Sequence, residues 1–535
     1  MLNRTLRRLL VAGASLAALS ACNGANDVAS PGNGGNITIN NPAPSPSPSP
    51  SPTPTPTAQI TPASGCPTIA DPQGLTDNGT ITNPTTGTYR VCALPTQINA
   101  SINLPYIQGV VYELPGRVDV GTDGGPTASN ADTDVTLSIE PGVVIYGGTG
   151  VSWLAVNRGN KINAVGTADK PIVFTSRDNI LGLNTDSSSG QWGGVVLMGR
   201  AQVTDCQDPA ATPGTTACER QTEGAVDPAL YGGNTNDDDS GVMDYVQIRY
   251  SGYVLSADSE LQSLTPEGVG SKTRIGHFMS FNSSDDAIEM FGGHPRVKHM
   301  VSVGAEDDNL DSDTGTKAHL QYVLVVQRQG IGDAMIEADT DNSSDGDTPR
   351  QNTKLANFTF IDRSPNNSDQ ASILLRGGTD YTMVNGVLSS ADNPCLRISR
   401  TQTASTTANA AIDEAGAPVF RSVVMTCGTP KYIGSNGVTA AEVEAIFGSG
   451  KNNNDDSFTL SLTNLFVNGA NENAVTPFDA ATLNDTGDTF FETTDHIGAV
   501  KDANDTWYQG WTCSSATVDF GGGESACSSL PVYDS

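Results

Sequence analysis

The feature that most constrains the fold is an internal repeat with a constant offset of 22 residues. Two segments share a histidine, an apolar alternation, an aspartate pair, a further acidic residue and a glycine. The equivalent residues are His277 and His299, Asp285 and Asp307, Asp286 and Asp308, Glu289 and Asp311, and Gly293 and Gly315. A period in the low twenties is typical of one coil of a parallel β-helix or of a leucine-rich repeat, and the leucine-rich pattern is absent.

Short β-rich runs extend the same organisation along the chain. Runs of four to six residues, as at 135–139, 142–146, 171–175 and 194–198, alternate with period two between Gly, Asn and Asp turns. No helical periodicity lies between them, which excludes doubly wound α/β folds. The sequence therefore predicts an all-β fold, a single-stranded right-handed parallel β-helix with end caps. Equivalent side chains of neighbouring coils would then lie about 4.8 Å apart.

The N-terminus predicts the location of the protein. Three arginines precede a short apolar run over 9–19, which leads into the sequence Leu-Ser-Ala-Cys22. This pattern resembles a bacterial lipobox, so we expect a signal peptide over 1–21 and lipidation of Cys22; the alternative is a plain secretory signal. Asn23 follows, where an aspartate would indicate inner-membrane retention. We therefore expect an outer-membrane or cell-surface lipoprotein, lipid-anchored or released, on a stiff Pro/Ser/Thr-rich tether over 22–65.

Charge and cysteine content restrict the partners and the compartment. The formal net charge of −31 excludes nucleic acid, and leaves the lipid as the only expected membrane contact. Eight cysteines remain besides Cys22, and they allow 105 disulfide connectivities. The simplest pairs them locally, as expected for an oxidising compartment. They are Cys66 with Cys92, Cys206 with Cys218, Cys395 with Cys427, and Cys513 with Cys527.

Acidic residues concentrate in the repeat. Between 276 and 347 there are 14 acidic residues and four Lys or Arg. Stacked carboxylates repel unless a cation or a proton intervenes, and calcium suits an irregular set of oxygen ligands. The alternative is a solvated acidic face. The predicted calcium ligands are Asp285, Asp286, Glu289, Asp307, Asp308, Asp311, Asp313, Glu337, Asp339 and Asp341.

Four of the five histidines lie within 43 residues, and the repeat stacks His277 on His299. Both alternate with apolar residues, so we expect both side chains to point inward. We favour a hydrogen-bonded core pair over a transition-metal site.

Catalysis is not clearly encoded. The aspartate pairs at 285–286 and 307–308 could act as acid and base in a polysaccharide hydrolase. Arg376, Arg397 and Arg400 could bind or deprotonate a uronate in a lyase. However, the ordered polygalacturonase motifs are missing, and neither G-x-S-x-G nor H-E-x-x-H occurs. We therefore lean towards a protein without enzymatic activity.

Several segments resemble a bacterial family of right-handed β-helix surface lipoproteins. They are 160–176, 191–196, 308–315, 497–500 and 507–512. The resemblance implies nutrient acquisition beside a TonB-dependent receptor or an exported enzyme, and one branch is similar to extracellular lipoproteins of phosphate starvation. The alternatives are a glycan-cleaving lyase or hydrolase and an adhesin or matrix protein.

The expected organisation of the mature chain follows from these segments. We expect an N-terminal cap over 66–132, β-helix coils over 133–430, and C-terminal coils with a cap over 431–535. One short helix is expected within 436–450, with Thr439 as its N-cap residue.

Overall fold

The computed structural model describes residues 59–533, apart from 226, 257–258, 341–343 and 365–369. The predicted signal peptide, Cys22 and Asp341 lie outside the described residues. None of the described helices is long and apolar enough to cross a membrane.

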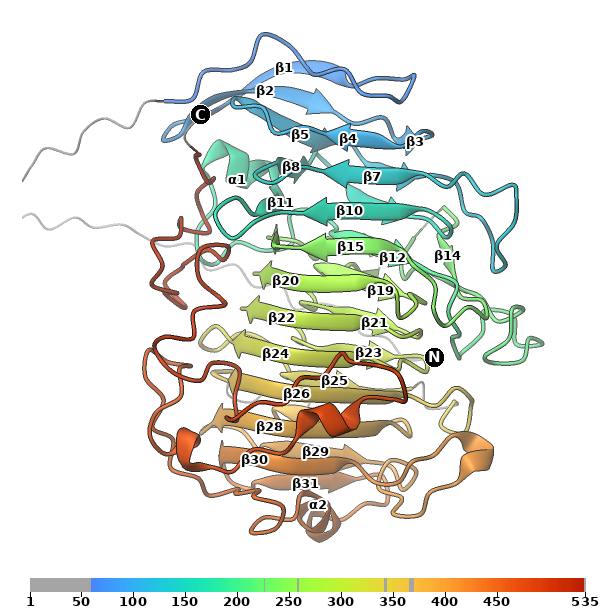
Figure 1. Cartoon of the computed structure of the whole chain (residues 1–535), viewed down its shortest axis with the longest axis vertical. Helices are drawn as coiled ribbons and strands as arrows, with labels where there is room; N and C mark the ends of the chain where they lie inside the picture. The colour runs from blue at the N-terminus through green and yellow to red at the C-terminus, as the bar shows by residue number, and fades with distance from the viewer. Residues whose placement is uncertain (1–58, 226, 257–258, 341–343, 365–369, 534–535) are drawn as a thin grey trace, which may run out of the picture. The chain divides into compact units, whose positions relative to one another are not determined.

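Two parallel sheets carry the fold (Figure 1). We call them the long sheet and the short sheet. The long sheet runs through β1 (Thr76–Asn83), β2 (Gly87–Ala93), β5 (Val110–Leu114), β8 (Val144–Gly147), β11 (Ile172–Ser176), β16 (Val246–Arg249), β20 (Arg274–Phe281), β22 (Arg296–Val303), β24 (His319–Val326), β26 (Asn352–Ile361), β28 (Asp380–Ser390) and β30 (Val419–Cys427). Four more strands join it alongside, β4 (Ile102–Leu104), β7 (Thr136–Ile139), β10 (Lys161–Val165) and β15 (Gly241–Asp244).

The short sheet contains the strand that completes each coil. Its order is β3 (Gln97–Ile98), β6 (Arg117–Val120), β9 (Trp153–Val156), β12 (Val195–Met198), β19 (Leu264–Glu267), β21 (Glu289–Phe291), β23 (Asp311–Asp313), β25 (Ile336–Ala338), β27 (Ile373–Leu375), β29 (Leu396–Ser399) and β31 (Tyr432–Ser435). Two small hairpins are β13 (Arg220–Gln221) with β14 (Leu230–Tyr231), and β17 (Val254–Ser256) with β18 (Ser259–Glu260). The helices are α1 (Arg177–Leu181), α2 (Ala440–Phe447) and the 3-10 turns η1 (Ala410–Ile412), η2 (Glu472–Ala474) and η3 (Ala480–Leu483).

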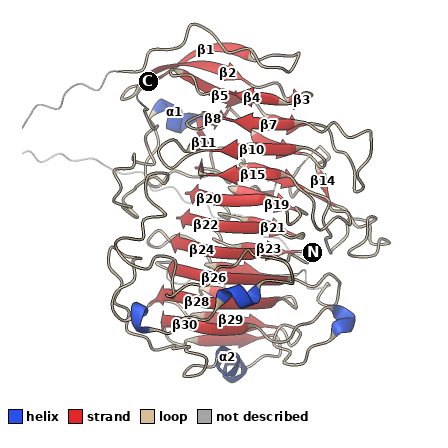
Figure 2. Cartoon of the chain, in the orientation of Figure 1, coloured by secondary structure: helices blue, strands red, loops and turns tan. Residues whose placement is uncertain are grey.

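The register confirms the predicted repeat. Ile275 pairs with Val297 between β20 and β22, and Glu289 pairs with Asp311 between β21 and β23, both at the offset of 22. Strand after strand adds in parallel, as Figure 2 shows in red. The predicted parallel β-helix is confirmed.

The core lies inside the coils and is filled by stacked apolar side chains. Phe278, Met300, Val323 and Phe358 follow one another in register on four successive coils, and all are fully buried. Gly386 comes next, and a Cβ there would lie 1.9 Å from the Phe358 ring. The glycine therefore leaves the space that the phenylalanine fills. Each fully buried large apolar side chain contributes about 1.5–3 kcal/mol.

The coils begin earlier than we predicted. β2 already pairs in parallel with β5, and β3 with β6, so coils occur within 66–132, where we expected only a cap. β1 is the edge strand of the long sheet at this end, and it pairs with β2 in the antiparallel direction. The reason is that the short alternating runs before residue 133 also complete coils, although the turns between them hide the repeat.

At the other end, α2 covers the last coil. Thr439 accepts a hydrogen bond from the N–H of Glu442, and the Glu442 carboxylate accepts one from the N–H of Thr439. This capping box confirms the predicted N-cap. Val443 and Phe447 on the inner face of α2 are buried, which places the helix over β30 and β31.

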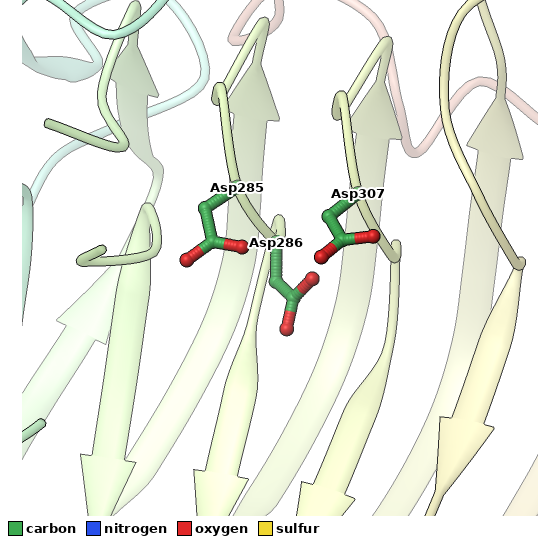
Figure 3. A group of neighbouring side chains, drawn as sticks. All are labelled: Asp285, Asp286 and Asp307. Atoms are coloured by element: carbon green, nitrogen blue, oxygen red, sulfur yellow. The ribbon is translucent and has the colours of Figure 1, made fainter. Parts of the chain in front are cut away.

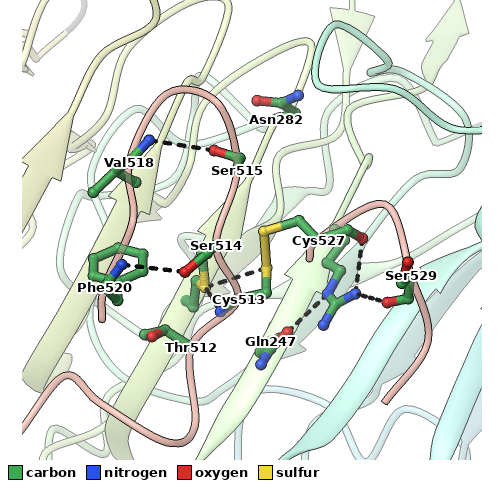
Figure 4. The surroundings of a disulfide bond; sticks show 12 residues. Gln247, Asn282, Thr512, Cys513, Ser514, Ser515, Val518, Phe520, Cys527 and Ser529 are labelled. Atoms are coloured by element: carbon green, nitrogen blue, oxygen red, sulfur yellow. Dashed lines mark hydrogen bonds between the residues drawn. A yellow bond between two sulfur atoms is a disulfide. The ribbon is translucent and has the colours of Figure 1, made fainter. Parts of the chain in front are cut away.

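After α2 the chain adds no named strand in its described part, although we expected C-terminal coils there. Residues 449–533, the return segment, instead run back along the long sheet (Figure 1). Asn385 Oδ1 accepts a hydrogen bond from the N–H of Phe478 at 2.7 Å. The guanidinium of Arg249 donates to the carbonyls of Cys527 and Ser529, both at 2.8 Å (Figure 4). The side chains on the outer face of the long sheet therefore fix the return segment.

All four sequence-local disulfides are present. They join Cys66 to Cys92, Cys206 to Cys218, Cys395 to Cys427 and Cys513 to Cys527. The last closes a loop within the return segment and lies against the long sheet (Figure 4). The predicted pairing is confirmed.

Candidate functional site

The predicted carboxylates meet on one side of the helix, at the short sheet and the turn that precedes it. We call this surface the acidic face. It consists of Asp285, Asp286, Glu289, Asp307, Asp308, Asp311, Asp313, Glu337 and Asp339. Asp285, Asp286 and Asp307 lie on two neighbouring turns and each offers a carboxylate oxygen within 4.8 Å of the others (Figure 3). Asp286, Glu289 and Asp311 form a second such group.

The coil register creates this arrangement. Glu289, Asp311 and Glu337 are direct neighbours on β21, β23 and β25, so their side chains form one column. Asp286 and Asp308 also stack, because Asp286 Oδ1 accepts a hydrogen bond from the N–H of Asp308 at 2.8 Å. A period of 22 with acidic residues at equivalent positions is thus sufficient to build the face.

Burial and mutual repulsion oppose ionisation of these carboxyls. Desolvation, followed by the charges of Asp307, Glu260 and Glu223, raises the pKa of Asp285 to about 7. The pKa values of Asp286, Glu289, Asp308, Asp311 and Asp313 are raised well above their ordinary range, first by desolvation and then by neighbouring carboxylates. Binding of protons or of a cation would relieve the repulsion between these carboxylates.

The donor set fits a hard cation. Both three-residue groups offer carboxylate oxygens only, without imidazole or thiolate. In addition, Asp313 Oδ1 is buried and has no hydrogen-bond partner. Calcium takes six to eight oxygen ligands in irregular geometry, so its preferences are compatible with such a set.

Of the three arginines considered for a lyase, Arg376 reaches the acidic face. Its guanidinium pairs with Glu337 and, through Nε at 2.9 Å, with Asp339. Arg400 pairs with Asp345 at 2.6 Å, and Arg397 donates to the hydroxyl of Ser435. The three guanidinium groups therefore have different partners, and of these only the partners of Arg376 belong to the acidic face.

Sequence reasoning missed an adjoining buried group formed by Glu267, Arg220 and Tyr231. The loop closed by Cys206 and Cys218 leads into β13 and β14. These strands pack over β9, β12 and β21 of the short sheet. Glu267 accepts a hydrogen bond from Thr222 at 2.6 Å, and burial raises its pKa to about 8. The only signal in the sequence was a glutamate at the end of an apolar strand, 22 residues before Glu289.

The histidines are not where we predicted. His277 and His299 do stack, with ring centroids 4.5 Å apart. However, both adopt left-handed backbone conformations, with φ of 22° and 61°. This corner interrupts the alternation, so the neighbours Ile275 and Phe278 both enter the core while the imidazoles turn outward against Trp511 and Trp507. The prediction of inward side chains is wrong.

Comparison with known proteins supports the fold. Residues 125–512 match a family model described as a pectate-lyase-like β-helix domain. No curated protein and no solved structure matches the chain.

Proposed function

We propose a function from the premise that the chain belongs to the pectate-lyase-like β-helix domain family: calcium on the acidic face binds the carboxylates of an acidic polysaccharide. The observation that carries this proposal is the pair of three-carboxylate groups, which share Asp286 and span neighbouring coils.

The geometry favours ion binding over hydrolysis with inversion. An inverting glycosidase needs its two carboxyls about 6.5–9.5 Å apart, with a water between them. The carboxylate oxygens here lie within 4.8 Å, which suits shared coordination of one ion. Three protein carboxylates leave coordination positions of calcium for ligand oxygens and water. A uronate carboxylate would take such a position.

Cleavage is the second candidate, favoured by the description of the family model. In a β-elimination, a base removes the proton next to the uronate carboxyl while the bond to the leaving sugar oxygen breaks. Of the arginines considered for a lyase, Arg376 reaches the acidic face, where it pairs with Glu337 and Asp339, and a guanidinium stays protonated in a protein. A protonated guanidinium binds a uronate and does not accept its proton, so binding without cleavage leads the proposal.

The location of the protein is part of the proposal. The lipobox-like sequence ending at Cys22 supports a lipid anchor at the outer membrane or cell surface. A calcium-dependent glycan-binding protein at that surface would collect polymer for a neighbouring TonB-dependent receptor or exported enzyme. This role in nutrient acquisition, whether of glycans or of phosphate, stays a prediction.

The test is binding of polygalacturonate to the full-length protein in detergent, with calcium or with EDTA. The methyl-esterified polymer is the matched neutral ligand. We expect calcium-dependent binding of the acid form alone, and at least a tenfold weaker affinity in Asp286→Asn and Asp311→Asn, because each removes one charged ligand. Asp237→Asn, at an exposed ion pair elsewhere, is the control. Equal binding in EDTA would contradict the proposal, and unsaturated products in the calcium sample would establish cleavage.

A further inference from the structure

A cavity of about 540 Å3 lies on the outer face of the long sheet, away from the acidic face. Its floor is formed by β15, β20 and β22, and one wall by residues 488–490 of the return segment. This volume is within the range of about 300–1,000 Å3 that is typical of small-molecule sites.

The cavity gathers positive charge in a strongly acidic protein. Arg274, Arg296 and Lys298 line it. Pairing of Ile275 with Val297 makes the two arginines neighbours on adjacent coils, and Gly276 is paired directly with Lys298. A Cβ at Gly276 would lie 2.7 Å from Asp244 Oδ1, so the glycine leaves this part of the cavity floor without a side chain.

The carboxylates nearby form ion pairs with only part of the guanidinium groups. Lys298 donates to Glu492 at 2.6 Å, but Arg296 Nη2 reaches Asp488 only at 3.4 Å. Arg296 Nη1 is buried without a hydrogen-bond partner. Arg274 is exposed and makes no hydrogen bond or ion pair with the described residues. Asp244, the other acidic lining residue, is paired with His277 at 2.8 Å.

Apolar groups complete the cavity. The Phe490 ring lies beside the cations, its centroid 5.5 Å from Lys298 Nζ and 6.0 Å from Arg296 Cζ. Val165 also lines the cavity and is 39% exposed, unlike the buried valines of the coils. A ligand that satisfies both kinds of wall has an anionic group and a ring with an apolar face.

We propose that this cavity binds a small organic anion, a carboxylate or phosphate group carried on a sugar-sized ring. Arg274 and Arg296 donate to the anionic group, and the ring packs against Phe490 and Val165. The proposal goes beyond the acidic face and does not rest on calcium, so the two sites can fail independently.

Isothermal titration of the full-length protein in EDTA tests the proposal, because EDTA prevents calcium-mediated binding at the acidic face. The probes are galacturonate, glucose 6-phosphate, inorganic phosphate and neutral glucose. We expect at least one of the two acidic sugars to bind, and thereby to identify the anionic group, while glucose does not. Inorganic phosphate should bind at least tenfold more weakly than the better acidic sugar, since it leaves the apolar wall uncovered. Raising the salt concentration should weaken binding.

Arg274→Glu should abolish binding, and Arg274→Ala should weaken it about tenfold or more, the usual effect of losing a charge-assisted hydrogen bond. Because Arg274 is exposed, both variants should keep the thermal transition of the wild type. Arg177→Glu, an exposed arginine on α1, is the matched control and should bind normally. Any of three results would overturn the proposal. The first is no heat with any probe up to about 10 mM, because a Kd that weak is near the lower limit of specific binding. The second is equal binding of glucose and the acidic sugars, and the third is unchanged binding in Arg274→Glu.

Discussion

The backbone N–H of Asp308 donates to Oδ1 of Asp286 at 2.8 Å, from one coil to the next. Asp308 repeats the contact, because its own Oδ1 accepts from the N–H of Ala334 at 2.6 Å. Each aspartate therefore joins two coils through Oδ1, and Asp286 also belongs to both three-carboxylate groups. Replacement by asparagine keeps the acceptor and removes the charge, whereas alanine would lose both.

Calcium should stabilise the protein through these aspartates. At one hundred times its Kd, an ion bound only by the folded state adds about 2.7 kcal/mol for each site. We expect thermal unfolding at pH 8 to shift upward with calcium over EDTA, and the shift to shrink in Asp286→Asn and Asp308→Asn. In EDTA both variants should be more stable than the wild type, because a repelling charge is gone. The same calcium shift in Asp286→Asn as in the wild type would refute the site, and Asp237→Asn serves as the control.

The coil and the acidic face could be predicted from the sequence because both depend on one local number, the period of 22. Glu289 and Asp311 are equivalent in the repeat, so parallel stacking of the coils makes them neighbours. The outward histidines could not be predicted from alternation, since a single left-handed residue such as His299 shifts every following side chain to the other face. The cavity at Arg274 also could not be predicted from the sequence, because one of its walls comes from residues about 200 positions later in the chain.

Glu267 should make stability depend on pH. Burial raises its pKa to about 8 in the folded protein, against an ordinary value near 4.5. Between these values the folded state holds a proton that the unfolded state has lost, so the free energy of unfolding falls as pH rises. The slope from one such group is about 1.4 kcal/mol per pH unit.

Glu267→Gln should reduce this slope between about pH 5 and pH 8, measured by urea unfolding in EDTA. The slope that remains belongs to the acidic face, where the pKa of Asp285 is also raised, to about 7. Glu444→Gln, on the exposed side of α2, should leave the slope unchanged. An identical pH profile for Glu267→Gln and the wild type would show that Glu267 ionises normally.

His299 should act in the opposite direction, at acidic pH. Burial lowers its pKa to about 3, so below about pH 6.5 only the unfolded state gains a proton there, and stability falls with pH. His299→Gln should reduce this acid sensitivity. At pH 7.5 the substitution should lower the free energy of unfolding by about 1 kcal/mol, because the ring contacts with Tyr322 and Trp507 are lost.

The return segment provides a second measurement of the same substitution. Trp507 and Trp511 pack on the histidine column, so His299→Gln should speed proteolysis within 449–533 more than within the coils. Tyr245→Phe keeps the ring that stacks on His277, with ring centroids 4.0 Å apart, and should behave like the wild type. Uniform proteolysis of coils and return segment in His299→Gln would mean that the column does not hold the segment in place.

The cap at α2 should protect the last coil from association. Thr439→Ala removes the capping box and should cost about 1 kcal/mol, whereas Thr439→Ser keeps the hydroxyl acceptor and should cost less. Because α2 covers β30 and β31, fraying of the helix exposes strand edges that can pair with another molecule. We therefore expect Thr439→Ala to increase light scattering on mild heating, before the main thermal transition, and Thr439→Ser to resemble the wild type. Should both variants unfold early without scattering, α2 would stabilise the coil without shielding its edge.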